Sequence, residues 1–392
     1  MSKRMRASLA ITGGLVCAAA QAQDGGAAAQ GAASPLTARI GASSSVTLYG
    51  LIEATVSDVT NTTASGARKL GFQAPWFSGS RLGFTGKHAF DDDLAGIFKL
   101  EAEYLPQNGA MTNNNVLFNR DAWAGFQSRR FGKLTFGRQN ALGRDISAIY
   151  GDPYGGASVT TGEGGYSNQN NFKNLVFYGG SATGTRMDNG IVWKKAWSEG
   201  LVAGLGFQFG STAGNLQRGQ TKSAALGYNL GAFHVAGFYT DADVAGHADR
   251  VYSVGANYQW PTVRVGGGWY HYSGDQAPRL QGRRDNAFTA HVRLTPTPLW
   301  DFTLGYVQIE AKHAAVDASG NVLNPFADPG ASTSLASGDR DTIYGAAMMH
   351  LDKSSDLYVA ADHLRMTGGY RASGAPGSTT QNELAVGLRY KF

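Results

Sequence analysis

Residues 382–392 read N-E-L-A-V-G-L-R-Y-K-F, and this stretch alternates strictly between two kinds of side chain. Every second position is apolar, and this set consists of Leu384, Val386, Leu388, Tyr390 and Phe392. The charged residues all fall on the other parity. Such alternation predicts a β-strand with one apolar and one polar face. Because free chain ends usually fray, an apolar strand that runs to the last residue predicts an end that is held in a sheet.

The same alternation starts at Val46 and continues through the chain. It is clearest over residues 98–104, 201–209, 252–260 and 288–294. Tight turns alternate with longer polar connections, and about 16 strands fit between them, the even number expected of a bacterial transmembrane barrel. The last strand would then close the barrel against residues 46–57.

Two all-β architectures compete for this pattern. A soluble β-sandwich also alternates, but its apolar faces meet in a core, and it needs no rhythm of short and long loops. In a membrane barrel the apolar face meets lipid, and closure satisfies every backbone N–H and C=O group. The 54 glycines and the 16% of charged residues suit many short strands and tight turns. The sequence therefore favours an all-β, antiparallel transmembrane β-barrel of 16 strands.

The N-terminus has the features of a secretory signal peptide at residues 1–22. Three basic residues precede an apolar stretch, and Ala20-Gln21-Ala22 offers a small-x-small cleavage site. The chain's single cysteine, Cys17, lies within this segment. Removal of the signal peptide would lower the formal net charge of the chain from +5 to +2. A net charge of this size is too small to suggest nucleic-acid binding. Residues 23–45 are rich in Ala, Gly and Ser and predict a low-complexity tether, followed by the barrel domain at 46–392.

Seven short motifs resemble those of the trimeric general porins of Gram-negative outer membranes, especially the β-proteobacterial branch. The motifs are S-V-T-L-Y-G (45–50), S-R-L-G-F-T-G (80–86), N-R-D-A-W-A-G-F (119–126), G-K-L-T-F-G-R-Q (132–139), D-P-Y-G-G (152–156), R-M-D-N (186–189) and L-R-Y-K-F (388–392). The resemblance covers residues 46–392. It implies a homotrimer in the cell outer membrane, surrounded by lipid and lipopolysaccharide, that carries small hydrophilic solutes and ions. It also implies that Tyr390 and Phe392 are the signal read by the outer-membrane assembly machinery.

The resemblance further implies that the third loop folds into the barrel and forms the constriction of the pore. Acidic residues on this loop would face basic residues on the wall and create a transverse field. The basic candidates are Arg81, Arg120 and Arg186, and the acidic candidates are Asp152, Asp145 and Glu163. Alternation agrees for Arg81, which is opposite in parity to Leu82 and Phe84, and places Arg120 opposite to Trp123. From these charges we expect a weak anion preference.

Two charged residues have the parity of the outer face. Arg138 shares the parity of Leu134 and Phe136, and Asp121 shares that of Trp123. A charge facing lipid is costly, so we expect both residues to lie at the contact between subunits, with residues 46–139 forming the trimer interface.

Other functions are weighed against the diffusion channel. An outer-membrane enzyme would need a catalytic constellation, and none of the 8 histidines falls in a recognisable motif. A substrate-specific outer-membrane channel would need an aromatic track or pocket in the lumen, and the third loop carries an added apolar stretch, N-L-V-F-Y (174–178), that would narrow or cap the pore. The long outer loops leave an adhesin or receptor role open. We expect a passive channel, with no catalysis, cofactor or metal.

Overall fold

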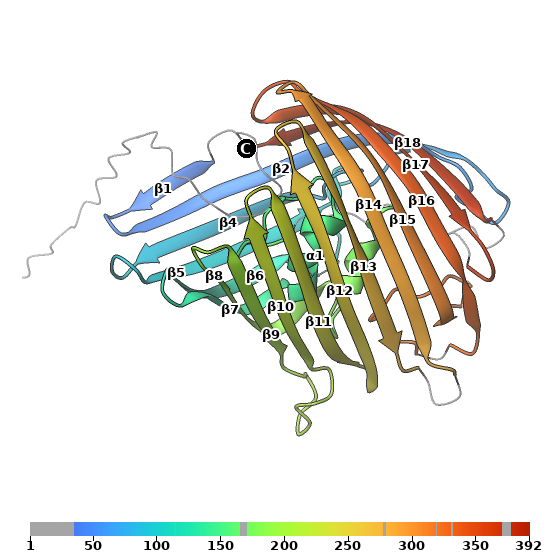
Figure 1. The fold of residues 1–392 in the computed structure, drawn as a ribbon, viewed down its shortest axis with the longest axis horizontal. Helices are drawn as coiled ribbons and strands as arrows, with labels where there is room; N and C mark the ends of the chain where they lie inside the picture. The colour runs from blue at the N-terminus through green and yellow to red at the C-terminus, as the bar shows by residue number, and fades with distance from the viewer. Residues whose placement is uncertain are drawn as a thin grey trace, which may run out of the picture.

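The computed structural model forms a closed β-barrel with one loop packed inside it (Figure 1). It describes residues 35–113, 115–164, 171–276, 280–318, 320–330, 332–370 and 378–392. Every pair of neighbouring strands is antiparallel. The predicted signal peptide at 1–22 lies outside the described residues.

Eighteen strands are described in all. They are β1 Leu36–Ile40, β2 Ser44–Val59, β3 Lys69–Phe72, β4 Ser80–Ala89, β5 Ala95–Tyr104, β6 Asp121–Ser128, β7 Gly132–Asn140, β8 Arg186–Ala196, β9 Leu201–Gln208, β10 Thr221–Leu230, β11 Phe233–Val244, β12 His247–Gln259, β13 Val263–Gly274, β14 Arg283–Thr297, β15 Trp300–Ala315, β16 Leu335–His350, β17 Ser355–Met366 and β18 Thr380–Lys391. β1 and β3 pair only with β2. The other 16 strands form the ring, which confirms the strand number expected from the sequence.

The barrel closes where β18 pairs with β2. Residues 383–391 run antiparallel to residues 51–59, and the backbone groups of Gly50 and Phe392 exchange two hydrogen bonds of 2.9 and 3.1 Å. The ring of Phe392 lies where a side chain at position 50 would be, since a Cβ there would sit 2.3 Å from its Cζ. Glycine at position 50 therefore allows the last residue to pack on the first long strand. The closure predicted from residues 382–392 is confirmed.

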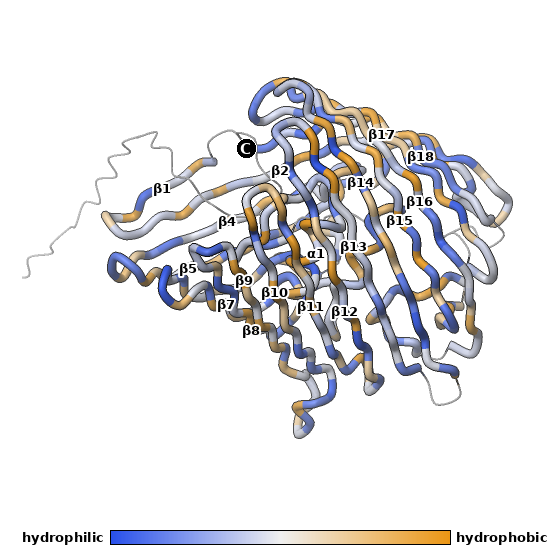
Figure 2. Tube along the Cα trace, viewed as in Figure 1, coloured by the Kyte–Doolittle hydropathy of each residue, from blue (hydrophilic) through white to orange (hydrophobic). Residues whose placement is uncertain are grey.

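Hydrophobic and hydrophilic residues follow one another along the strands (Figure 2), and the burial pattern places the apolar side chains on the outer face of the barrel. In β18, Leu384, Val386 and Leu388 remain 45–54% exposed, whereas Ala385 between them is buried. The same pattern recurs in β10 and β17. A continuous apolar outer face is the arrangement that lipid requires of a spanning barrel.

The N-terminal part of the described chain adds one short strand. Leu36–Ile40 pairs with residues 44–48 of β2, and its side chains are exposed. This strand falls within the segment 23–45 for which the sequence predicts a tether. The first barrel strand starts at Ser44, two residues before the start expected from the sequence.

Loop 3 is defined as residues 141–185, and its described residues lie inside the barrel (Figure 1). Its helix α1, Leu142–Gly151, packs mainly against β10, β11, β12 and β13, and every residue of the helix is buried. Its second helical turn, the 3-10 helix η1, spans Lys173–Gly179 and contains the apolar stretch 174–178. This stretch packs on the wall, where the Tyr178 hydroxyl donates to Asp285 of β14 at 2.7 Å. None of the helices in the described part of the chain has the length and hydropathy of a membrane span.

Candidate pore constriction

The first basic residue of the wall is Arg81 on β4. Its neighbour Leu82 and the next residue but one, Phe84, are 41% and 38% exposed on the outer face, so Arg81 points into the lumen as expected. It lies opposite Glu103 of β5 in the strand register. Even so, the Arg81 guanidinium makes no hydrogen bond or ion pair with a described residue. Its charge is held by no ion pair, although the carboxylates of Glu101 and Glu103 lie within electrostatic range of it.

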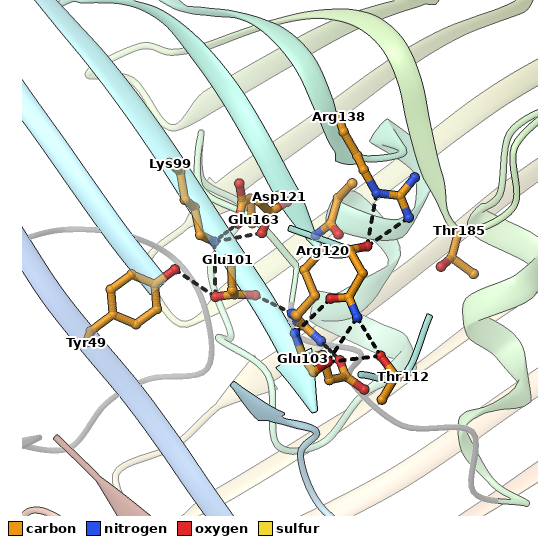
Figure 3. A network of polar contacts seen from close by, with 12 residues as sticks. Tyr49, Lys99, Glu101, Glu103, Thr112, Arg120, Asp121, Arg138, Glu163 and Thr185 are labelled. Carbon is orange, nitrogen blue, oxygen red and sulfur yellow. Dashed lines mark hydrogen bonds and ion pairs between the residues drawn. The ribbon is translucent and has the colours of Figure 1, made fainter. Parts of the chain in front are cut away.

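Arg120 differs from Arg81, because its guanidinium group forms ion pairs with carboxylates. It precedes β6, is buried, and forms ion pairs with both Glu101 and Glu103 of β5 (Figure 3). The backbone N–H of Arg120 also donates to the carbonyl of Glu101 at 3.1 Å. Arg120 lines the predicted constriction, but its charge is compensated within the wall.

Lys99 of β5 is the centre of this polar network (Figure 3). Its ammonium group lies 3.6 Å from Glu101, 3.0 Å from Asp121 and in direct contact with Glu163 of loop 3. Tyr49 donates a hydrogen bond of 2.7 Å to Glu101. One lysine thus joins three carboxylates, one of which belongs to the loop.

Glu163 is the residue that fastens loop 3 to the wall of β5 and β6. Besides Lys99, its carboxylate accepts a 3.0 Å hydrogen bond from the indole N–H of Trp123. Burial alone would raise the pKa of the Glu163 carboxyl, but the Lys99 ammonium outweighs it and holds this pKa below its ordinary value. Glu163 is therefore ionised at neutral pH and pairs with the wall instead of standing free in the lumen.

Asp145 of α1 is also a loop residue paired with the wall. Its carboxylate contacts the ammonium of Lys194 on β8, and it accepts hydrogen bonds from the Asn140 side chain at 2.8 Å and from the backbone of Gly164 at 2.6 Å. Both ends of the carboxylate are occupied. Asp145 fixes the start of loop 3.

Asp152, the third acidic candidate, lies at the C-terminal end of α1. Its carboxylate accepts the backbone N–H of Tyr154 at 2.9 Å and so shapes the turn that follows the helix. The cations in electrostatic range of it are Lys173 and Arg264. Among the described residues, no hydrogen bond or ion pair joins Asp152 to the three predicted arginines.

Arg186 is the first residue of β8 and directly follows loop 3. It lies within electrostatic range of Arg120 and of Arg144 on α1, and also of the carboxylates of Glu101, Glu103 and Asp121. Two of its guanidinium nitrogens, Nε and Nη2, are buried without a hydrogen-bond partner among the described residues. Arg186 and Arg81 thus form no ion pair with a described residue, although carboxylates of the wall lie within electrostatic range of both.

Asp121 does not lie on the outer face, so the expectation that it contacts a neighbouring subunit is wrong. It is 1% exposed and pairs with Lys99 inside the barrel, and Trp123 points inward with it. The prediction took Arg120 as an inward residue and assigned Asp121 and Trp123, which have the opposite parity, to the outer face. Arg120 precedes β6, so its parity does not apply within the strand.

Arg138 does have the parity of the outer face, beside the exposed Phe136. A bulge at Gly137, where φ is +127°, shifts the register against β8. The Arg138 guanidinium pairs with Asp188 of β8 and donates to the backbone carbonyl of Asn119. Its charge is compensated within one chain, so lipid contact no longer requires a neighbouring subunit to neutralise it.

The two aromatic residues of the predicted assembly signal lie side by side at the end of β18. Tyr390 is exposed on the outer face, and its ring is stacked with that of Phe392 at a centroid distance of 6.3 Å.

Sequence reasoning missed five charged residues of this site: Lys99, Glu101, Glu103, Arg144 and Lys194. Lys99, Glu101 and Glu103 occupy every second position of β5. Three charged residues on one face of a strand could have indicated that this face lines the pore. No group of potential metal ligands occurs among the residues that the structure describes.

The fold and the charged constriction define a class of protein, a barrel with a polar lumen narrowed by an inserted loop. Residues 7–369 match the family model of the Gram-negative porins, so the chain belongs to this family and its barrel lies in the outer membrane.

An outer membrane porin protein of Bordetella pertussis is 28% identical over 261 residues, which are 57% of this chain and 63% of the relative. Among solved structures, the anion-selective porin from Comamonas acidovorans superposes with a TM-score of 0.69 at 19% identity, covering 89% of this chain and all of that one. The trimer form of OmpT from Vibrio cholerae gives a TM-score of 0.62 at 15% identity, with 90% and 100% covered. These structural likenesses concern the fold.

Proposed function

We propose that this protein is a general diffusion porin, a passive channel for small hydrophilic solutes and ions across the outer membrane, with a weak anion preference. The observation that carries the proposal is the constriction itself. A loop is fastened inside a closed barrel by Glu163 and Asp145, and the wall beside it displays charged side chains. The proposal includes no catalysis and no cofactor.

The anion preference follows from which charges are compensated. The carboxylates of Glu101, Asp145 and Glu163 all form ion pairs. Arg81 and Arg186 form none with described residues. In a narrow site of low effective dielectric, uncompensated charge decides which ions enter. The anion-selective porin from Comamonas acidovorans, which shares the fold, supports the same sign.

Single-channel recording in planar bilayers tests this function. We expect stable conductance steps that appear in threes, and a reversal potential under a salt gradient whose sign reports anion preference. Steps in threes would support the homotrimer, the state in which OmpT of Vibrio cholerae was solved. Folded protein that gives no conductance would refute the channel.

The same recordings test the subunit contact. Residues 46–139 remain our candidate for the trimer interface, now supported by the exposed apolar residues of β2, β4 and β7 and not by charge. We expect Arg138→Glu, which would place a carboxylate beside Asp188, to reduce steps in threes. Unchanged triplet steps would count against an interface at β7.

A substrate-specific channel is the second candidate, because aromatic side chains gather inside the barrel. Trp76, Phe77, Tyr154 and Phe172 form ring contacts with centroids 4.5 to 6.5 Å apart. Saturation of conductance by one class of solute at low concentration would favour this candidate over general diffusion.

Tyr390 and Phe392 are proposed as the signal for the assembly machinery. We expect Phe392→Ala to lower the amount of heat-resistant barrel in outer-membrane fractions, because the mutation removes both the terminal ring and its contact with Gly50. Leu384→Ala, on the same strand and outer face, is the control. Equal yields of both variants would contradict the role of Phe392.

A further inference from the structure

A second loop also folds into the barrel. We call residues 60–79 loop 1, and its last five residues, 75–79, turn inward before β4 begins. Trp76 and Phe77 are 0% and 2% exposed, although the flanking parts of loop 1 are exposed. Loop 1 thus carries two large apolar side chains into the interior of the barrel, where they join a buried apolar cluster of loop 3 and the wall.

The barrel wall fixes this inward turn through Glu53 of β2. The fully buried carboxylate of Glu53 accepts the backbone N–H groups of Phe77 at 2.8 Å and of Ser78 at 2.9 Å. It also accepts the hydroxyl of Tyr358 at 2.9 Å and lies 3.3 Å from Arg389. Hydrogen bonds to a charged acceptor are the strong ones, so the Glu53 carboxylate stabilises the inward turn.

Loop 3 contacts the same turn from the opposite side. The buried Lys173 of η1 donates a hydrogen bond to the backbone carbonyl of Phe77. The ring of Trp76 lies 4.8 Å from that of Phe172, and the ring of Phe77 lies 4.5 Å from that of Tyr154.

The contact continues to the wall strands beyond. Phe172 is stacked on Tyr344 of β16 at 4.1 Å, and Phe77 lies 4.5 Å from Tyr358 of β17. We name these six rings the aromatic bridge: Trp76, Phe77, Tyr154, Phe172, Tyr344 and Tyr358. Aromatic pairs of this geometry add about 0.5–1.5 kcal/mol each beyond their burial. The bridge therefore joins loop 1, loop 3 and the wall into one packed unit.

The inward turn also touches the charged wall. A Cβ at Gly79 would lie 2.4 Å from the carboxyl carbon of Glu103, which pairs with Arg120. Loop 1 thus contributes two rings to the aromatic bridge, and its last residue lies against a carboxylate that pairs with Arg120.

We propose that loop 1 forms the second half of the constriction. Trp76 and Phe77 fill the lumen between loop 3 and strands β16, β17 and β2, and so confine the passage to the side where Arg81 and Arg186 lie. They are positioning residues that set the cross-section of the pore, while the arginines set the sign of its charge. This inference rests on the proposed channel function.

The test is the double variant Trp76→Ala and Phe77→Ala, recorded in planar bilayers and in liposomes that swell with neutral sugars of increasing size. Because conductance follows the pore cross-section, we expect it to rise by about 1.5-fold or more, and larger sugars to enter. The sign of the reversal potential should stay the same. The matched control is the double variant Tyr258→Ala and Trp260→Ala, an aromatic pair on the outer face that should leave conductance unchanged.

A second readout does not depend on conductance. Chymotrypsin should cut loop 3 after Phe172 or Phe177 faster in the double variant than in the wild type, because the bridge no longer holds the loop. If the double variant does not fold, Lys173→Met, which keeps both rings, should change both readouts in the same direction.

Two outcomes overturn different parts of this account. A folded double variant with wild-type conductance, size limit and proteolysis would overturn the role of loop 1. A wild type that does not conduct, combined with faster cleavage of the variant, would refute the channel while keeping loop 1 as the support of loop 3.

Discussion

Reversing the charges of Arg81 and Arg186 together, in Arg81→Glu and Arg186→Glu, is expected to turn the channel from anion-preferring to cation-preferring. Neither guanidinium forms an ion pair with a described residue, so each can act on a passing ion, although carboxylates of the wall lie within electrostatic range of both. At about 5 Å and an effective dielectric constant of about 20, one charge contributes roughly 3 kcal/mol. Even after screening by salt, the permeability ratio should change by about tenfold.

The reversal potential in a salt gradient measures this change. Arg250→Glu is the matched control, since Arg250 lies on the outer face of β12, half exposed, where its charge pairs with Asp241. It should leave the reversal potential as in the wild type. An unchanged sign in the folded double variant would mean that other charges decide selectivity.

Lys99→Met is expected to destabilise the barrel more than any other single change considered. The mutation leaves Glu101, Asp121 and Glu163 buried around an apolar side chain. Removing one partner of a buried ion pair costs about 3–5 kcal/mol, because the remaining charge loses its compensation. Unfolding in urea, followed by circular dichroism in detergent, should show this loss of free energy.

The effect should depend on pH in a defined direction. In the wild type, pairing with Lys99 lowers the pKa of Glu163 below its value in the unfolded chain, about 4.3. The ion pair therefore adds its full stability above the unfolded pKa. This stability is lost as the pH falls through the lowered pKa of the folded protein. In Lys99→Met, Asp121 and Glu163 can protonate without losing the ion pair with Lys99, because the mutation has already removed it. The difference in stability between the two proteins should therefore shrink below about pH 4.

Lys222→Met is the control for both measurements, because Lys222 lies exposed on the outer face of β10 and forms no ion pair with a described residue. A difference in stability of similar size in both variants, or one that stays constant down to pH 3, would argue against the network around Lys99.

Residues in regular strands were predictable because alternation fixes the side of the sheet. Arg81 lies within β4, so its parity, opposite to that of Leu82 and Phe84, correctly predicted that its side chain points into the lumen. Asp121 was assigned to the wrong face because the strand begins at that residue, and nothing in the sequence marks the change from loop to strand.

The ion-pair partners of the loop residues could not be predicted from the sequence, for a different reason. The pairing of Glu163 with Lys99, and that of Asp145 with Lys194, joins residues 64 and 49 positions apart across the lumen. Periodicity describes neighbours along one strand and carries no information on how a loop of 45 residues crosses a barrel. For the same reason, alternation could not predict that the end of loop 1 turns into the barrel.

The seam between β2 and β18 has a consequence for the order of folding. Its two strands come from opposite ends of the chain, and the Ser57–Glu383 hydrogen bond spans 326 positions. Until β18 has been made, β2 keeps an edge of unpaired N–H and C=O groups, which invites pairing with other chains. Contacts of such long sequence separation form slowly. The nascent protein must therefore be kept from aggregating through its open edge until the last strand arrives.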